Sequence, residues 1–141
     1  MLKKPSYELM DHTADIGVHV YGCDAKDLFQ NAALALVDQL VETLDLIPRQ
    51  EEQITIEGND WPDLMVNWLR EILYLWAGKA ILVQSVQIES LSENSLAAHL
   101  WVDPFSLDRH TLKSEIKAVT YHQIQVFDTG DRWEANIIFD T

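Results

Sequence analysis

The order of the hydrophobic patterns predicts an α+β fold, with two helices packed on a mostly antiparallel β-sheet. Strand-like alternation near the N-terminus is followed by two long segments of helical periodicity, which are separated by one short strand. A run of alternating segments then follows, and strands joined by short turns pair antiparallel. The chain has 141 residues, of which 48% are hydrophobic. This length suits a single domain spanning residues 1–141 around one core.

The N-terminal region is predicted to form two strands on either side of a polar turn. Residues 7–10 lead into the polar stretch 11–17, and Ile16, Val18 and Val20 then alternate as in a half-buried strand. The stretch contains two carboxylates, an imidazole and a hydroxyl. Asp and Thr side chains often bond their own backbone, so a turn is the simpler interpretation of these residues alone, and a binding site is the alternative.

The first helix is predicted over residues 25–43. Asp24 precedes it and can accept hydrogen bonds from the free amides of its first turn. Apolar residues then recur every three or four positions, which places them on one face: Leu28, Ala32, Leu36, Val37, Leu40 and Val41. Pro48 cannot continue a helix, and the alternation over residues 53–57 predicts a short strand after it.

The second helix is predicted to begin at Asn59 or Asp60 and to stop at Gly78, because glycine favours helix C-termini. Trp68 and Trp76 belong to its apolar stripe, so we expect them in the core and not in a ligand platform. The alternation after this helix predicts five further strands, over residues 81–88, 96–102, 112–119, 121–127 and 133–139.

The charge balance restricts the partners that the chain can have. The formal net charge is −13, from 23 acidic and 10 basic residues. A surface this negative repels phosphate backbones, so we expect no direct binding to RNA or DNA. Residues 38–63 contain eight acids and one base, which is typical of a solvated face but also suits a basic protein or a cation. With no apolar run of membrane-spanning length, we expect no membrane contact and a cytoplasmic protein.

The sequence contains no motif for catalysis by the chain itself. It lacks a glycine-rich phosphate loop, a Gly-x-Ser-x-Gly elbow and paired cysteines, since Cys23 is the single cysteine. The residues thus nominate no nucleophile and base. His19 and His99 fall within predicted strands and are interpreted as structural. For the remaining histidines, His12, His110 and His122, fixing a turn by hydrogen bonding is a better interpretation than acting as a catalytic base.

Five segments, taken together and in order, resemble the archease family over residues 7–141. One is a His-Thr-Ala-Asp-Ile-Gly motif, one a helix, one a loop before a strand, one a Glu-Ile-Lys-Ala-Val-Thr-Tyr-His motif and one a terminal Phe-Asp. They are residues 12–17, 64–75, 103–105 with His110, 115–122 and 139–140. The family usually ends on an aliphatic residue after its last aspartate, whereas this chain ends on Thr141.

The resemblance implies a metal site formed by Asp15, Asp140 and Thr141, the last through its carbonyl or terminal carboxylate. Hard cations prefer such oxygen ligands, and water would complete the shell. Calcium is the expected ion, with magnesium or manganese as alternatives. The competing interpretation is that the two aspartates cap turns at a sheet end.

The resemblance also implies a function as a protein cofactor that activates another enzyme and is not itself an enzyme. The chain would activate the GTP-dependent RNA ligase RtcB, by promoting formation of the guanylylated ligase and its multiple turnover in tRNA splicing and RNA repair. Two other classes remain open on the residues alone. One is a general protein chaperone or modulator with an acidic surface, and the other is a metal-dependent hydrolase that uses Asp15 and Asp140.

Overall fold

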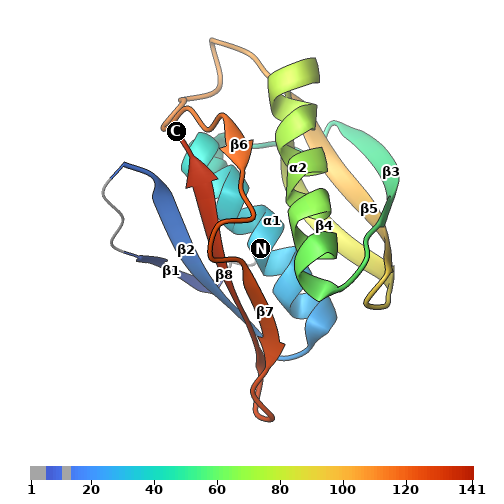
Figure 1. The fold of residues 1–141 in the computed structure, drawn as a ribbon. Coiled ribbons are helices and arrows are strands. Elements are labelled where there is room, and N and C mark those ends of the chain that lie inside the picture. The colour runs from blue at the N-terminus through green and yellow to red at the C-terminus, as the bar shows by residue number, and fades with distance from the viewer. Residues whose placement is uncertain (1–5, 11–13) are drawn as a thin grey trace.

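The strands form two antiparallel sheets, with two helices packed between them (Figure 1). The computed structural model describes residues 6–10 and 14–141. The five-stranded sheet has the order β1-β2-β8-β6, with β7 also paired to β8, and the three-stranded sheet has the order β3-β5-β4. The strands of the first sheet are β1 (Tyr7–Met10), β2 (Ile16–Gly22), β6 (Ala118–Val119), β7 (Gln125–Asp128) and β8 (Trp133–Asp140). Those of the second are β3 (Gln50–Glu57), β4 (Ile81–Leu91) and β5 (Ser95–Pro104).

The first helix, α1 (Ala25–Leu40), begins where the sequence predicts. The Asp24 side chain accepts a hydrogen bond from the Asp27 backbone N–H at 2.7 Å. The helix ends three residues before the predicted end, because Val41 adopts an extended backbone and forms a bridge with Leu112. A short 3-10 helix, Thr43–Asp45, follows. The end of α1 is thus set by pairing with a distant segment. The hydrophobic periodicity of the helix itself cannot indicate such a pairing.

The second helix, α2 (Trp61–Lys79), is capped by Asp60, which accepts from the Asp63 backbone N–H at 2.9 Å. The predicted stop at Gly78 is wrong. Gly78 lies inside α2, and the left-handed C-cap is Ala80, with a φ of 54°. Gly78 instead leaves room for the Tyr74 side chain, because a Cβ at position 78 would lie 2.5 Å from the Tyr74 ring.

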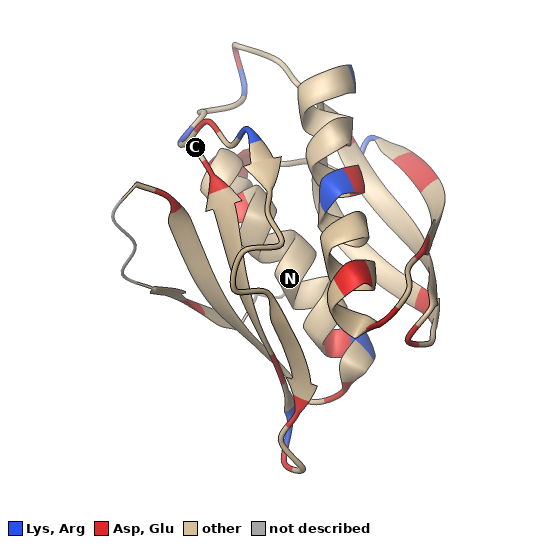
Figure 2. Ribbon diagram, in the orientation of Figure 1, with Lys and Arg blue, Asp and Glu red and all other residues tan. Residues whose placement is uncertain are grey.

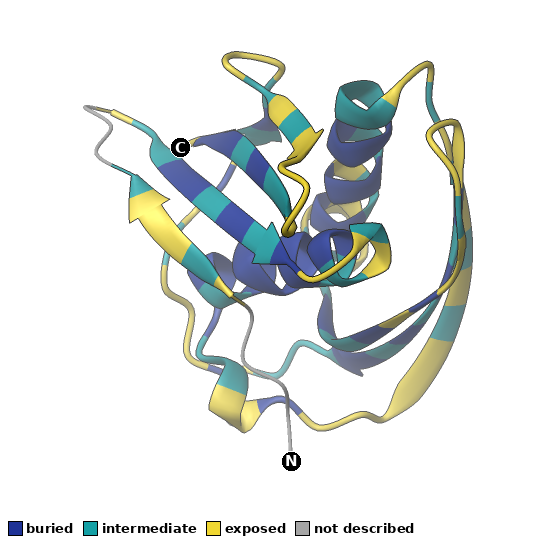
Figure 3. Cartoon of the chain, turned by 90° about the horizontal axis from the view of Figure 1, so that it is seen from below, coloured by how far each residue is buried: buried dark blue, intermediate teal, exposed yellow. Residues whose placement is uncertain are grey.

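The core contains residues from both helices and both sheets (Figure 3). Trp68 is fully buried, and its indole Nε1–H donates a hydrogen bond to the Phe29 carbonyl at 2.8 Å. Trp76 is partly buried against the same core, with its ring edge-on to Phe105 at 5.3 Å between centroids. The prediction that both tryptophans belong to the packed interior is therefore confirmed.

Two of the predicted late strands are much shorter in the structure. The stretch 112–119 is extended only at β6, apart from the isolated bridge at Leu112. The stretch 121–127 begins with a turn in which Gln123 has a positive φ of 56° and the Ile124 N–H bonds the Tyr121 carbonyl. In these two stretches, apolar residues that alternate in the sequence lie in loops and still pack against the core, as Ile116 and Ile124 do.

A candidate metal site where two strands meet the chain end

The two aspartates of the predicted site lie at the same end of the five-stranded sheet. Asp15 directly precedes β2, and Asp140 is the last residue of β8. These strands pair antiparallel, and Ile16 is opposite Phe139. One further step in this register places Asp15 opposite Asp140. Residues directly opposite one another in an antiparallel pair have Cβ atoms about 5 Å apart and point to the same face, so the register favours convergence of the two carboxylates.

The C-terminal residue is held against the segment that precedes β2. The Thr141 hydroxyl donates a hydrogen bond to the Ala14 carbonyl at 2.8 Å. The Lys117 backbone N–H donates to the Asp140 carbonyl at 2.7 Å, next to the pairing of Ala118 with Asp140 in β6. The final two residues are thus bonded on one side to residue 14 and on the other to residue 117. The Thr141 side chain is engaged with protein, so a cation would use the terminal carboxylate or carbonyl.

The donor set at this end of the sheet consists of oxygen atoms. Asp15 is partly buried and Asp140 is exposed, so both carboxylates remain within reach of water. Like charges directly opposite one another in a sheet destabilise it, and a bound cation would remove that repulsion. Carboxylates together with water are the ligands that calcium and magnesium take. These residues therefore fit a hard cation.

Within the described residues, no three His, Cys, Asp or Glu side chains are placed to hold a metal ion. A cation bound by Asp15 and Asp140 would accordingly need the chain end or water as further ligands. His12 and Thr13 of the motif lie outside the described residues. His122 is exposed, and its backbone N–H bonds the Thr120 hydroxyl.

His110 fixes a turn, as the sequence predicts. Its Nδ1 accepts a hydrogen bond from the Ser106 backbone N–H at 2.9 Å, and its Nε2 donates to the buried Asp103 carboxylate at 2.9 Å. Arg109 forms two further hydrogen bonds with that carboxylate, at 2.9 and 3.0 Å, and the Ile47 N–H donates to it at 2.9 Å. Both ring nitrogens of His110 are occupied, so it is not available as a base.

Asp103 is the buried charge on which this turn depends, and sequence reasoning missed its role. Burial alone would raise the pKa of the Asp103 carboxyl, but hydrogen bonds from Arg109, Ile47 and His110 outweigh burial and hold that pKa well below its usual range. The ionised carboxylate joins residues 47 and 106–110, so the connection before β6 has a defined path. The Asp-Pro-Phe motif with a following histidine was the available signal.

The histidines of the strands are structural, as predicted. His19 in β2 bonds Glu134 at 2.6 Å and also contacts Asn136, both in the neighbouring β8. His99 in β5 contacts Glu51 in β3 through Nε2 at 2.5 Å. Each imidazole therefore joins two adjacent strands.

The acidic residues of the stretch 38–63 are distributed over several elements. Figure 2 shows acidic positions on both helices and on strands of both sheets. Several have local partners. Asp38 accepts a hydrogen bond from the Tyr7 hydroxyl, Asp60 caps α2, and Asp63 accepts a hydrogen bond from the Tyr121 hydroxyl at 2.6 Å. The eight acids of the stretch therefore lie on α1, around the 3-10 helix, on β3 and at the start of α2, and not on one element. None of the helices within residues 6–10 and 14–141 has the length and hydropathy that a bilayer crossing requires.

The structure defines a small α+β protein in which two helices lie between two antiparallel sheets, and Asp15 and Asp140 lie at one end of the five-stranded sheet. The same fold occurs in protein 1598 of Methanobacterium thermoautotrophicum, with a TM-score of 0.80 and 27% identity over 96% of this chain and 99% of that one. It also occurs in an archease of Thermotoga maritima described as a possible chaperone, with a TM-score of 0.63 and 20% identity over 100% and 98% of the two chains.

The sequence comparisons identify the family. The model of the archease protein family matches residues 7–141. The protein archease of Methanosarcina barkeri is 33% identical over 138 residues, which cover 95% of this chain and 94% of the relative. That of Pyrobaculum islandicum is 30% identical over 142 residues, covering 98% and 97%. The chain belongs to the archease family.

Proposed function

We propose that this protein activates the GTP-dependent RNA ligase RtcB and does not itself catalyse a reaction. In this proposal the sheet end that carries Asp15, Asp140 and Thr141 binds a divalent cation, calcium first, with magnesium or manganese as alternatives. It presents that cation to the nucleotide-binding site of the ligase. Guanylylation of the ligase histidine becomes faster, so that the ligase turns over repeatedly in tRNA splicing and RNA repair.

The observation that carries the proposal is the register between β2 and β8. With Ile16 opposite Phe139, the ladder brings Asp15 and Asp140 from opposite ends of the sequence to one sheet end. The bond from Thr141 to the Ala14 carbonyl adds the chain end to them. Membership of the archease family supports the same site, since these are the positions that the family resemblance assigned to metal.

The chemistry of this sheet end suits an accessory role. Two carboxylates with a bound cation can orient phosphate groups and metal ions of another protein, and a cation offsets negative charge on phosphates. Transfer of the guanylyl group needs a nucleophile, which in the proposal is the histidine of the ligase. The activator positions the cation. When the two proteins are bound together, residues of both form one site around the nucleotide.

The direct test is ligation turnover by RtcB with GTP and manganese, in the presence and absence of this protein. The ligase is held well below the RNA concentration, so that a single turnover and repeated turnover are distinguished. Addition of this protein should convert a burst of one product per ligase into continued product formation. Guanylylated ligase, followed with labelled GTP, should form faster. Unchanged turnover and an unchanged rate of guanylylation would reject the proposal.

A general protein chaperone or modulator is the second candidate. It is favoured by exposed apolar residues on two segments that are bonded together, Leu44 and Ile47 on one, Leu107 and Leu112 on the other. Such side chains can contact another protein. A general chaperone would suppress heat aggregation of unrelated proteins, whereas a dedicated activator would not. Light scattering of an aggregating test enzyme, with and without this protein, separates the two functions.

A further inference from the structure

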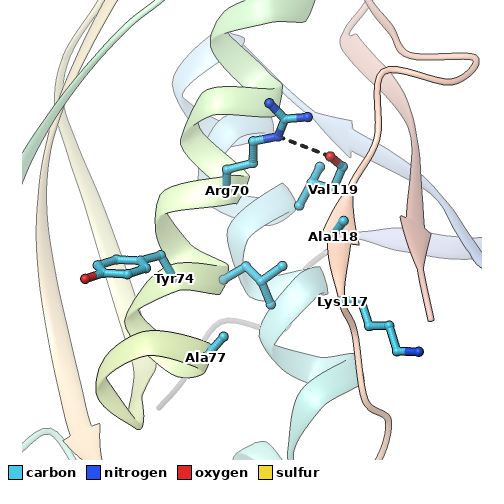
Figure 4. A pocket seen from close by; sticks show the side chains of 7 residues that line it. Arg70, Tyr74, Ala77, Lys117, Ala118 and Val119 are labelled. Atoms are coloured by element: carbon cyan, nitrogen blue, oxygen red, sulfur yellow. Dashed lines mark hydrogen bonds between the residues drawn. The ribbon is translucent and has the colours of Figure 1, made fainter.

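A pocket of about 360 Å³ lies between α2 and β6, beyond the residues proposed for metal binding. Figure 4 shows α2 on one side and the β6 segment on the other. The lining residues are mostly apolar or basic, and none is acidic: Arg70, Leu73, Tyr74, Ala77, Lys117, Ala118 and Val119. A non-acidic pocket stands out in a chain of formal net charge −13.

Arg70 differs from the other arginines of the chain in its surroundings. Arg49 and Arg109 lie beside Asp103, and Arg132 pairs with Glu134 at 3.0 Å. Among the described residues, no carboxylate forms an ion pair with Arg70. Asp63 interacts with Arg70 electrostatically, but its carboxylate accepts a hydrogen bond from the Tyr121 hydroxyl and forms no ion pair with Arg70. The guanidinium can therefore bind an external anion directly.

The guanidinium of Arg70 is held in place by two contacts. Its Nε donates a hydrogen bond to the Val119 carbonyl at 3.2 Å, and its Cζ lies 4.8 Å from the centroid of the Tyr121 ring. Tyr121 is itself held by the carboxylate of Asp63. The terminal Nη1 and Nη2 groups have no acceptor among the described residues. A positioned fork with two unused donor groups matches the geometry of a phosphate or carboxylate.

The remaining walls of the pocket favour a ligand with an apolar part. Ala77 of α2 and Ala118 of β6 lie on opposite sides of the pocket (Figure 4), and Leu73 of α2 also lines it. Figure 4 shows the side chain of Lys117, the residue before β6, pointing away from α2. Lys117 therefore adds positive potential at the rim without a direct contact, and Arg70 is the residue that would hold the anion.

We propose that this pocket binds a small organic oxyanion, such as a phosphate ester or a carboxylic acid with a short apolar body. The oxyanion receives hydrogen bonds from Nη1 and Nη2 of Arg70, and the apolar body lies between Leu73, Ala77 and Ala118. A phosphate ester binds more tightly than a carboxylate, because its second charge is attracted by both Arg70 and Lys117. This site does not depend on the proposed ligase activation.

The test is a titration of the isotope-labelled full chain followed by amide NMR, with a chelator present so that no cation at the chain end recruits phosphate. The probes are phenyl phosphate, benzoate, inorganic phosphate and phenol. Phenyl phosphate should produce saturable shifts at Ala77, Ala118 and Val119, with weaker binding of benzoate and inorganic phosphate. Equal binding of phenol would overturn the role of charge, and equal binding of inorganic phosphate would overturn the role of the apolar wall.

Substitutions identify the anchor. Arg70→Gln should weaken phenyl phosphate at least about tenfold, since hydrogen bonds to a charged group are lost. Arg70 is exposed, and circular dichroism verifies that α2 is retained. The matched control is Arg132→Gln, which removes an exposed arginine at the opposite end of β8 and should leave affinity unchanged. Lys117→Gln should weaken binding less than Arg70→Gln does. Equal affinity in Arg70→Gln and the parent would overturn the proposal.

Discussion

At the scale of single residues, Asp15 and Asp103 show two uses of a carboxylate. Asp15 lies at a sheet end, partly exposed to water, whereas Asp103 is buried and accepts hydrogen bonds from Arg109, His110 and the Ile47 backbone. Burying a carboxylate without hydrogen-bond donors is energetically unfavourable, and Asp103 is accordingly surrounded by hydrogen-bond donors. A carboxylate at a surface can keep oxygen atoms for a ligand. Substitution should therefore affect stability at one position and activation at the other.

We expect Asp15→Ala to remain folded and to lose activation of RtcB. The side chain lies outside the apolar core, so its removal should change the melting temperature by only a few degrees. The matched control is Asp131→Ala, which removes an exposed acid from the turn at the opposite end of β8. Turnover assays and thermal melts of both variants are the measurement. Normal activation by Asp15→Ala, or a large fall in its melting temperature, would remove Asp15 from the proposed site.

Asp103→Asn should destabilise the protein by about 3 kcal/mol at neutral pH, because it breaks a buried ion pair. The pKa of Asp103 is lowered on folding, so its stabilising contribution is complete above the unfolded value near 3.9 and is lost as pH falls through the lower folded value. The difference in unfolding free energy between parent and variant should hence shrink below about pH 4. Urea titrations at pH 7 and pH 3 measure it. A difference that does not change with pH would contradict this account.

At the scale of elements, the last residues of β8 connect three parts of the chain. The Asp140 carbonyl accepts from Lys117, and the Thr141 hydroxyl bonds Ala14. These contacts lie at one end of the sheet, while Ile137 and Phe139 of β8 are fully buried. The end of β8 can therefore be altered without opening the core. This separation makes the chain end suitable for testing the metal site.

Deletion of Asp140 and Thr141 should abolish both metal binding and activation while leaving the core intact. Thr141→Val is the matched control. It loses one exposed hydrogen bond, worth about 1 kcal/mol, but keeps the terminal carboxylate, so activation should be retained. Calorimetry with calcium, magnesium and manganese, together with turnover assays, measures both effects. A two-residue deletion that still stimulates RtcB at the parent rate would show that the chain end is not part of the mechanism.

At the scale of the whole molecule, the net charge of −13 affects how partners are approached. The acids are spread over both helices and both sheets, so the field is negative in many directions. In the proposed complex, the phosphate-binding site of the ligase carries positive charge and attracts this negative surface. Exposed charges are screened over about 8 Å at physiological ionic strength.

Binding to RtcB should therefore weaken as salt concentration rises, and RNA alone should not bind this protein at moderate salt. Titration calorimetry or fluorescence anisotropy between about 50 and 500 mM salt measures the first effect, since screening grows over this range. Gel-shift assays with the ligase substrate RNA measure the second. Tight binding of RNA by this protein alone would contradict the charge argument.

The sequence by itself determined the α+β class, the presence of both helices with an Asp24 cap on the first and a cap at Asn59 or Asp60 on the second, and the structural roles of His19, His99 and His110. These features depend on residues close together in the chain, where periodicity and capping act directly. The likeness of its motifs to archeases supplied the expected metal ligands, which the residues alone left as one alternative to a turn.

Only the tertiary structure decided which strands are neighbours. The pairing of β2 with β8, the division into two sheets, and the early end of α1 at Val41 all depend on contacts between distant segments. The hydrogen-bond donors around Asp103 and the pocket beside Arg70 likewise depend on contacts between separate segments. Local patterns specify which face of a segment is buried, but not what covers it, because every strand offers the same backbone N–H and C=O groups to any partner strand.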